Sequence, residues 1–139
     1  MKTILIVLPL IFTMGMCDPN PNNHRRPILG RYELVGHDTS GRLVFTGTIS
    51  LKSLEQNHLK GQCTIVREKD AAEGVLNQQG GCEGSLDGKK VNLDLAPSLD
   101  DAGLLLEGEL NAIRISGIWR LDGFATSNPL GTFEAVKKE

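Results

Sequence analysis

Residues 42–67 read RLVFTGTISLKSLEQNHLKGQCTIVR and carry the pattern that decides the fold. Apolar residues alternate with polar ones, and a glycine stands at the centre of FTGTI (45–49) and of LKGQC (59–63). Alternation at period two is typical of a β-strand with one buried face. A glycine on that face weakens a strand but lets it bend and coil tightly, as the wall of a small barrel must. The stretch therefore predicts two coiled strands that follow one another.

The same glycine-centred pattern returns along the chain, in CEGSL (82–86), LEGEL (106–110) and ISGIW (115–119). No window of ten or more residues shows a helical stripe of apolar positions. Because the predicted strands follow one another through mostly short connections, we expect an all-β fold, an eight-stranded antiparallel up-and-down barrel over residues 28–139. The strands are expected at 31–37, 42–51, 58–67, 79–86, 89–95, 104–110, 113–121 and 130–137.

The alternation does not itself say which face lies inside, so an outer-membrane barrel is the alternative. Such barrels carry aromatic girdles and strands of about 9–11 residues. This chain has one Trp and one Tyr, and its glycines would lie in the middle of the lipid face. The interior is therefore predicted to be apolar, lined by Leu43, Phe45, Ile49, Leu59, Ile65, Val91, Leu93, Leu95, Leu104, Leu106, Ile113, Ile115 and Leu121.

In strand number and order, residues 30–137 resemble the calycin-like barrels, among them the lipocalins and avidins. The lipocalin Gly-x-Trp near the first strand is replaced by Gly30-Arg31-Tyr32, and the lone Trp119 stands in the seventh expected strand. The several tryptophans of the avidin ligand site are absent. The resemblance implies an architecture and no site residues, and an architecture does not fix a function.

The first residues are predicted to be an export signal. Lys2, the apolar run at 4–12 and the small residue Gly15 form the three regions of a secretory signal peptide over 1–16. Residues 14–17, MGMC, resemble the lipobox of bacterial lipoproteins, with Met16 where Gly or Ala is usual. The resemblance implies acylation of Cys17 and a Pro- and Asn-rich tether at 17–27 that holds the barrel at a membrane. The alternative is cleavage after Cys17 and a free periplasmic or secreted protein.

Two cysteines remain if Cys17 is acylated or removed. An even number in an exported chain predicts one disulfide, between Cys63 and Cys82. A hairpin centred near residues 72–73 would place the two opposite each other on adjacent strands. Two buried free thiols, or a metal pair with further ligands, are the alternatives.

The two ends of the predicted barrel differ. One end carries the connections 38–41, 68–78, 96–103 and 122–129, and the other carries 52–57, 87–88 and 111–112. Long loops on a rigid scaffold are where binding residues concentrate. The ligand-mouth candidates at the long-loop end are Phe45, Trp119, Phe124 and Phe133. The alternative is that these rings fill the narrow interior of the barrel.

Composition and charge exclude several functions. The net charge of −2 leaves no basic face for a nucleic acid. The expected inner face contains no acid or base, so no catalytic residue is predicted. His37 and His58 fall at opposite ends and His24 lies in the tether, while Asp100-Asp101 lacks the spacing of a calcium loop. No metal or cofactor site is predicted.

We therefore expect an exported, lipid-anchored, non-enzymatic barrel of the cell envelope that binds a small apolar ligand or an envelope protein through its long-loop end. A periplasmic inhibitor of proteases or lysozymes is the alternative, with 68–78 and 122–129 as its contact surface. A cyclase or isomerase that works by enclosing an apolar substrate, and a purely structural envelope protein, also remain open.

Overall fold

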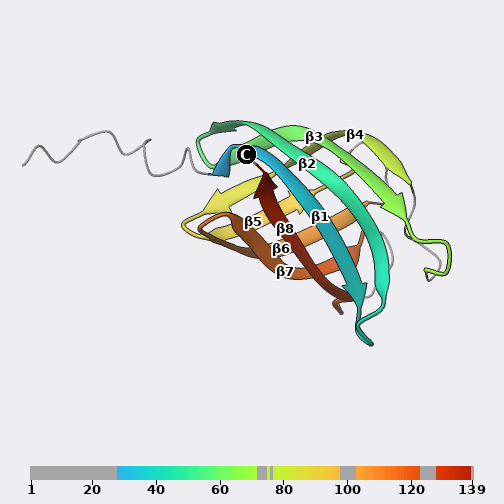
Figure 1. Ribbon diagram of the computed structural model, residues 1–139. Helices are drawn as coiled ribbons and strands as arrows, with labels where there is room; N and C mark the ends of the chain where they lie inside the picture. The colour runs from blue at the N-terminus through green and yellow to red at the C-terminus, as the bar shows by residue number, and fades with distance from the viewer. Residues whose placement is uncertain (1–27, 72–74, 76, 98–102, 123–127, 139) are drawn as a thin grey trace, which may run out of the picture.

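The computed structural model describes residues 28–71, 75, 77–97, 103–122 and 128–138. Eight antiparallel strands form a closed barrel in chain order, with β1 paired to both β2 and β8 (Figure 1). This is the predicted fold. The strands are β1 Gly30–Asp38, β2 Leu43–Glu55, β3 His58–Arg67, β4 Gln78–Asp87, β5 Lys90–Asp94, β6 Leu104–Asn111, β7 Arg114–Leu121 and β8 Gly131–Lys138.

One end of the barrel is built from three tight turns. Only residues 56–57, 88–89 and 112–113 separate the strands there. Gln56 and Asn57 both have positive φ, 48° and 72°, and Gly88 and Ala112 do so at 61° and 54°. Two-residue turns of this kind match the twist of paired strands. We call this the short-turn end; β1 begins and β8 ends there, on the left of Figure 1.

Strand β2 contains two irregularities that the alternation did not reveal. Its pairing with β3 shifts between Leu51 and Ser53, which lets β2 continue to Glu55. The predicted six-residue connection at 52–57 is therefore wrong, because most of it belongs to the strand. A β-bulge of this kind adds one residue and increases the local twist.

The second irregularity corrects the predicted inner face. Between β1 and β2 the register shifts at Gly36/His37, so that Gly36 pairs with Phe45 and His37 pairs with Leu43. Val44 and Phe45 are both buried, and Leu43 is 39% exposed rather than inward. Ile113 is also wrongly predicted, since it occupies the turn before β7 and is 57% exposed.

The other predicted inner-face residues are buried, apart from Leu121, which is partly buried against the core. Among the described residues no polar or charged residue belongs to the buried set. The described residues contain no helix long and apolar enough to cross a membrane. The interior of the barrel is thus the single hydrophobic core of the described chain.

Candidate functional site

Three of the four aromatic candidates lie inside the barrel, in the half next to the long connections. Phe45, Trp119 and Phe133 are 0%, 4% and 3% exposed. The rings of Phe45 and Trp119 meet edge to face, with centroids 5.4 Å apart and planes at 79°. This geometry is favourable for the aromatic quadrupoles. Phe124, the fourth candidate, lies outside the described residues.

Glycines on the inner face make room for these rings. Gly36 pairs with both Phe45 and Phe133, and a Cβ at Gly36 would overlap the Phe45 ring. A Cβ at Gly108 would lie 2.9 Å from Cζ of Phe133. At the centres of the glycine-centred pattern (Gly47, Gly61, Gly84, Gly108 and Gly117) an added Cβ would overlap a carbonyl oxygen of the adjacent strand, so close approach of strand backbones explains the pattern. The buried rings fill this part of the core, as the alternative interpretation expects.

The indole nitrogen fixes the ring of Trp119. Its Nε1 donates a hydrogen bond to the carbonyl oxygen of His37, at 2.8 Å. This bond satisfies the only polar atom of the indole and joins β7 to the end of β1.

The two described histidines lie far apart, as predicted. His37 lies near the end of β1, at the long-loop end of the barrel, and His58 lies at the start of β3, at the short-turn end.

The opposite half of the core contains Tyr32. Its hydroxyl donates to the carbonyl oxygen of Ile28, at 2.7 Å, and Tyr32 and Ile28 are both fully buried. Burial raises the pKa of Tyr32 to about 12, because the phenolate would lose its hydration. Tyr32 is therefore a neutral structural residue that fixes Ile28 beneath the short-turn end.

The predicted disulfide is not formed in the structure, because Cys63 and Cys82 are free and buried. In the observed register Cys63 pairs with Gly80 and Gly61 pairs with Cys82, so the two cysteines share a face but are offset by two residues. Hydrogen bonding with the Cys82 thiol, together with burial, raises the pKa of Cys63. The thiol of Cys63 also donates to the carbonyl oxygen of Leu95, at 3.1 Å.

The wall of the barrel is incomplete between β4 and β5. Their pairing extends only from Asp87 with Lys90 to Glu83 with Asp94, where β5 ends. The first half of β4, residues 78–82, pairs with β3 on one side and has no ladder partner in β5 on the other. Beyond Asp94 the amide of Leu95 donates to the carbonyl oxygen of Leu104 on β6. A gap in the ladder thus opens at the long-loop end.

A hollow of about 280 Å3 occupies this gap, lined by residues 77–81 together with Leu95 and Ala96. Gly80 shares the inner face with Cys63, and a Cβ added to Gly80 would have no heavy atom within 4 Å. The hollow therefore borders Gly80 on β4 and the buried residues Leu95 and Ala96. Sequence reasoning missed it, because only the position where β5 ends creates it.

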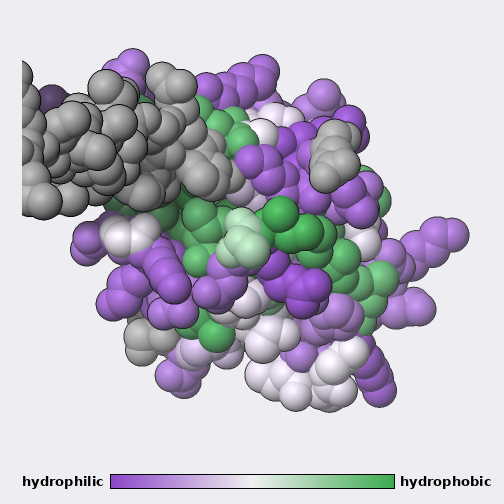
Figure 2. Space-filling view, turned by 60° about the vertical axis from the view of Figure 1, so that its left-hand side comes forward, coloured by the Kyte–Doolittle hydropathy of each residue, from purple (hydrophilic) through white to green (hydrophobic). Residues whose placement is uncertain are grey.

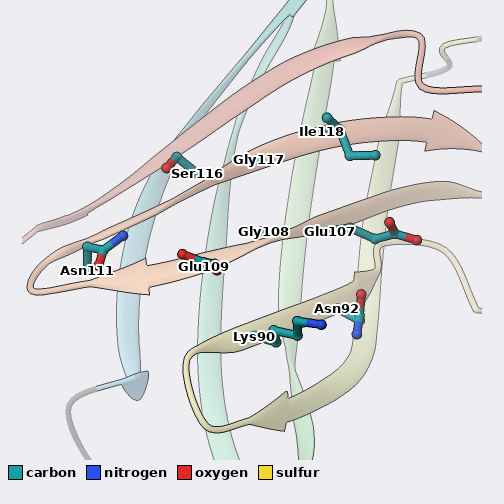
Figure 3. A pocket seen from close by; sticks show the side chains of 9 residues that line it. All are labelled: Lys90, Asn92, Glu107, Gly108, Glu109, Asn111, Ser116, Gly117 and Ile118. Atoms are coloured by element: carbon teal, nitrogen blue, oxygen red, sulfur yellow. The ribbon is translucent and has the colours of Figure 1, made fainter.

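A second hollow, of about 500 Å3, lies across the outside of β5, β6 and β7 (Figure 3). Gly108 and Gly117 pair directly in its floor, and polar side chains surround them. The carboxylate of Glu107 at its edge already accepts a hydrogen bond from Arg120, at 2.6 Å. Lys90 and Glu109 stand opposite each other on β5 and β6. This hollow is an open, polar surface whose charges are largely balanced.

Comparison with known proteins gives a fold and no family. No family model matches the chain, and no curated protein matches it. One similar solved structure is described as the structure of EF1p2_mFAP2b bound to DFHBI. The similarity covers 83% of this chain and 96% of that one, with a TM-score of 0.56 and 9% sequence identity. At this identity the similarity shows that the two chains share the eight-stranded barrel fold, and it shows nothing further.

Proposed function

We propose that this protein is an exported, lipid-anchored and non-enzymatic β-barrel that binds a small apolar molecule at its long-loop end. The observation that carries the proposal is the gap between β4 and β5, where the hollow beside Gly80 meets Leu95 and Ala96. Small-molecule sites are concave, mostly apolar and usually preformed, with volumes from about 300 Å3 upward. The hollow, at about 280 Å3, is close to the lower end of this range, and Leu95 and Ala96 are its apolar residues.

Two further observations support a binding role. The similar solved barrel was determined with a bound compound, DFHBI. The buried set of the described residues contains no carboxylate, imidazole or amine that could act on a substrate within the core. A ligand at the gap would instead meet Leu95 and Ala96, the glycine backbone of β4 and the polar residues Asn77, Gln78 and Gln79.

Export and anchoring rest on the sequence. The apolar run at 4–12 and the resemblance of residues 14–17 to a lipobox support cleavage before Cys17 and acylation of that residue. The chain enters the barrel at the short-turn end, where β1 begins. An acyl chain at Cys17 would therefore hold that end toward a membrane and leave the gap facing away from it.

The ligand-binding part is tested by titration with the dye 1-anilinonaphthalene-8-sulfonate, whose fluorescence rises when it leaves water. Gly80→Val puts a side chain into the inner space of the gap, and we expect it to weaken dye binding at least tenfold. Gln62→Val is the control, because Gln62 is an exposed residue of β3 that does not line the hollow. Equal affinities of the two variants would contradict a site in the gap.

Mass spectrometry of the protein purified from its own cells tests the lipid anchor and the presence of a bound ligand. A denatured mass that corresponds to the chain from Cys17 plus acyl groups is expected, with an additional noncovalent mass under native conditions. A lipid-free chain that begins at Asp18 would contradict the anchor. The absence of any additional mass, together with no dye binding, would contradict the carrier function.

A further inference from the structure

The charged side chains of the described residues are distributed unequally along the barrel axis. The short-turn end comprises residues 28–33, 52–60, 85–91, 108–115 and 135–138. These segments carry eight Lys or Arg and four Asp or Glu, a net charge of +4, whereas the other described residues carry four and eight, a net charge of −4. The near-neutral composition therefore conceals a basic short-turn end and an acidic remainder of the described barrel.

The basic residues of the short-turn end are accessible. Seven of the eight cations are exposed, among them Lys89 and Lys90 at the β4–β5 turn and Lys138 at the end of β8. Two ion pairs reduce this charge, Arg114 with Glu134 at 2.8 Å and Lys138 with Glu33 at 3.3 Å. All four side chains are 44–59% exposed, and exposed pairs of this kind are weak. The seven exposed cations remain accessible to an anionic partner.

An exposed apolar side chain stands among these charges. Ile113 lies in the two-residue turn between β6 and β7, next to Arg114. Figure 2 turns the left-hand side of Figure 1 forward and shows hydrophobic side chains surrounded by hydrophilic ones. A Lys- and Arg-rich surface with an apolar side chain between the charges is the composition that peripheral membrane proteins present to a bilayer.

We infer that the short-turn end binds directly to the surface of an anionic lipid bilayer. The cations lie in or near every turn of this end, at the start of β1 and at the end of β8, so they match an extended sheet of negative headgroups. A single free phosphate would need several donors that converge on one point. The binding requires no acyl chain at Cys17 and is thus independent of the proposed anchor. It would fix the orientation of the barrel, with the gap between β4 and β5 directed away from the lipid.

Vesicle co-sedimentation of the full chain tests the inference. The chain carries Cys17→Ser in every sample, so that no acyl group can contribute. Vesicles of phosphatidylcholine are compared with vesicles in which about one-third of the lipid is phosphatidylglycerol. We expect binding to the anionic vesicles that falls steeply as salt is added, because salt screens the attraction. Equal binding to both vesicles would overturn the inference.

Two matched double variants locate the surface. Lys89→Glu with Lys90→Glu changes the short-turn end, and Arg42→Glu with Lys69→Glu makes the same charge change at the opposite end. Each lysine near an anionic bilayer strengthens binding about fivefold, so the first pair is expected to weaken it at least about 25-fold. The second pair is expected to bind almost as the parent does. An equal loss in both would show a mere effect of net charge and would overturn the inference.

The same samples separate this inference from the proposed ligand site. Lys89→Glu with Lys90→Glu is expected to retain the circular dichroism spectrum and the dye binding of the parent chain. Loss of vesicle binding with intact dye binding in this variant supports membrane binding by the short-turn end and shows that it is separate from the ligand site. Intact vesicle binding in this variant would overturn the inference and leave the ligand site unaffected.

Discussion

At the scale of single residues, the barrel depends on glycines that contact other parts of the chain. A Cβ at Gly131 would overlap the carbonyl oxygen of His37 and lie 2.6 Å from Nε1 of Trp119. The same atoms form the hydrogen bond between Trp119 and His37. Gly131 thus permits the close approach of β8 to β1 and of the indole to both. Gly80, by contrast, faces open space.

We therefore expect Gly131→Ala to destabilise the protein by about 2–3 kcal/mol, since backbone must move to admit the methyl group. Gly80→Ala is the control and is expected to be neutral or to stabilise by about 0.5–1 kcal/mol, because alanine loses less conformational entropy in a strand. Urea denaturation followed by Trp119 fluorescence measures both. Similar losses in the two variants would mean that strand propensity, rather than contact, explains the glycines.

Tyr32 predicts how stability depends on pH. Its pKa is about 12 in the folded protein and 10.0 as the ordinary value, so the folded state holds the proton more tightly. The contribution of this group is complete below pH 10 and is lost as the pH rises toward 12. We expect the stability advantage of the parent over Tyr32→Phe to shrink over this interval in urea denaturation. An advantage that stays constant from pH 9 to 12 would contradict the burial of the hydroxyl.

At the scale of elements, alternation predicted every strand to within a few residues. It could not place the bulges in β2. Leu43, Val44 and Phe45 are three consecutive apolar residues, and either phase of the alternation fits them; pairing of β1 with Phe45 and then Leu43 decides which are buried. The offset of Cys63 from Cys82 likewise depends on where β4 begins to pair with β3. Such registers depend on contacts between segments and not on local pattern.

The candidate site, too, could be predicted only in part from the sequence. Periodicity placed Phe45, Trp119 and Phe133 together on the inner face, and their contact with the core follows. The space beside Gly80 could not be predicted, since it exists only because β5 ends at Asp94 while β4 continues to Gln78. The sequence alone does not show whether the space beside a glycine is filled by another residue or is empty.

The unequal lengths of β4 and β5 predict a difference in amide hydrogen exchange within a single strand. In an antiparallel pair each edge of a strand uses alternate residues. We expect every second amide of 78–82 to exchange rapidly, whereas 83–85 is protected on both edges by β3 and β5. Exchange measured by NMR resolves the two halves. Uniform protection along β4 would show that the gap is closed in solution.

At the scale of the whole molecule, closure of the barrel depends on β8. This strand pairs with β7 on one side and with β1 on the other, and it contributes Phe133 and Ala135 to the core. Without it, two strand edges would be open, and open edges pair with other chains. The fold therefore has no dispensable terminal strand among those that the structure describes.

Removal of residues 131–139 is accordingly expected to abolish cooperative thermal unfolding and to produce aggregates on size-exclusion chromatography. Removal of residues 138–139 alone is the control. It deletes the Lys138–Glu33 pair, which is exposed, and is expected to change stability by less than about 1 kcal/mol. A soluble monomer that unfolds cooperatively without 131–139 would contradict the role of β8 in closure.

The pairing of β1 with β8 also determines when the barrel can close during synthesis of the chain. Arg31, near the start of β1, pairs with Lys138 at the end of β8, far along the chain. Contacts between such distant segments require a large loop to close, and folds rich in them form slowly. A ribosome releases β1 long before β8. Until β8 emerges, one edge of β1 stays unpaired, and the barrel cannot close.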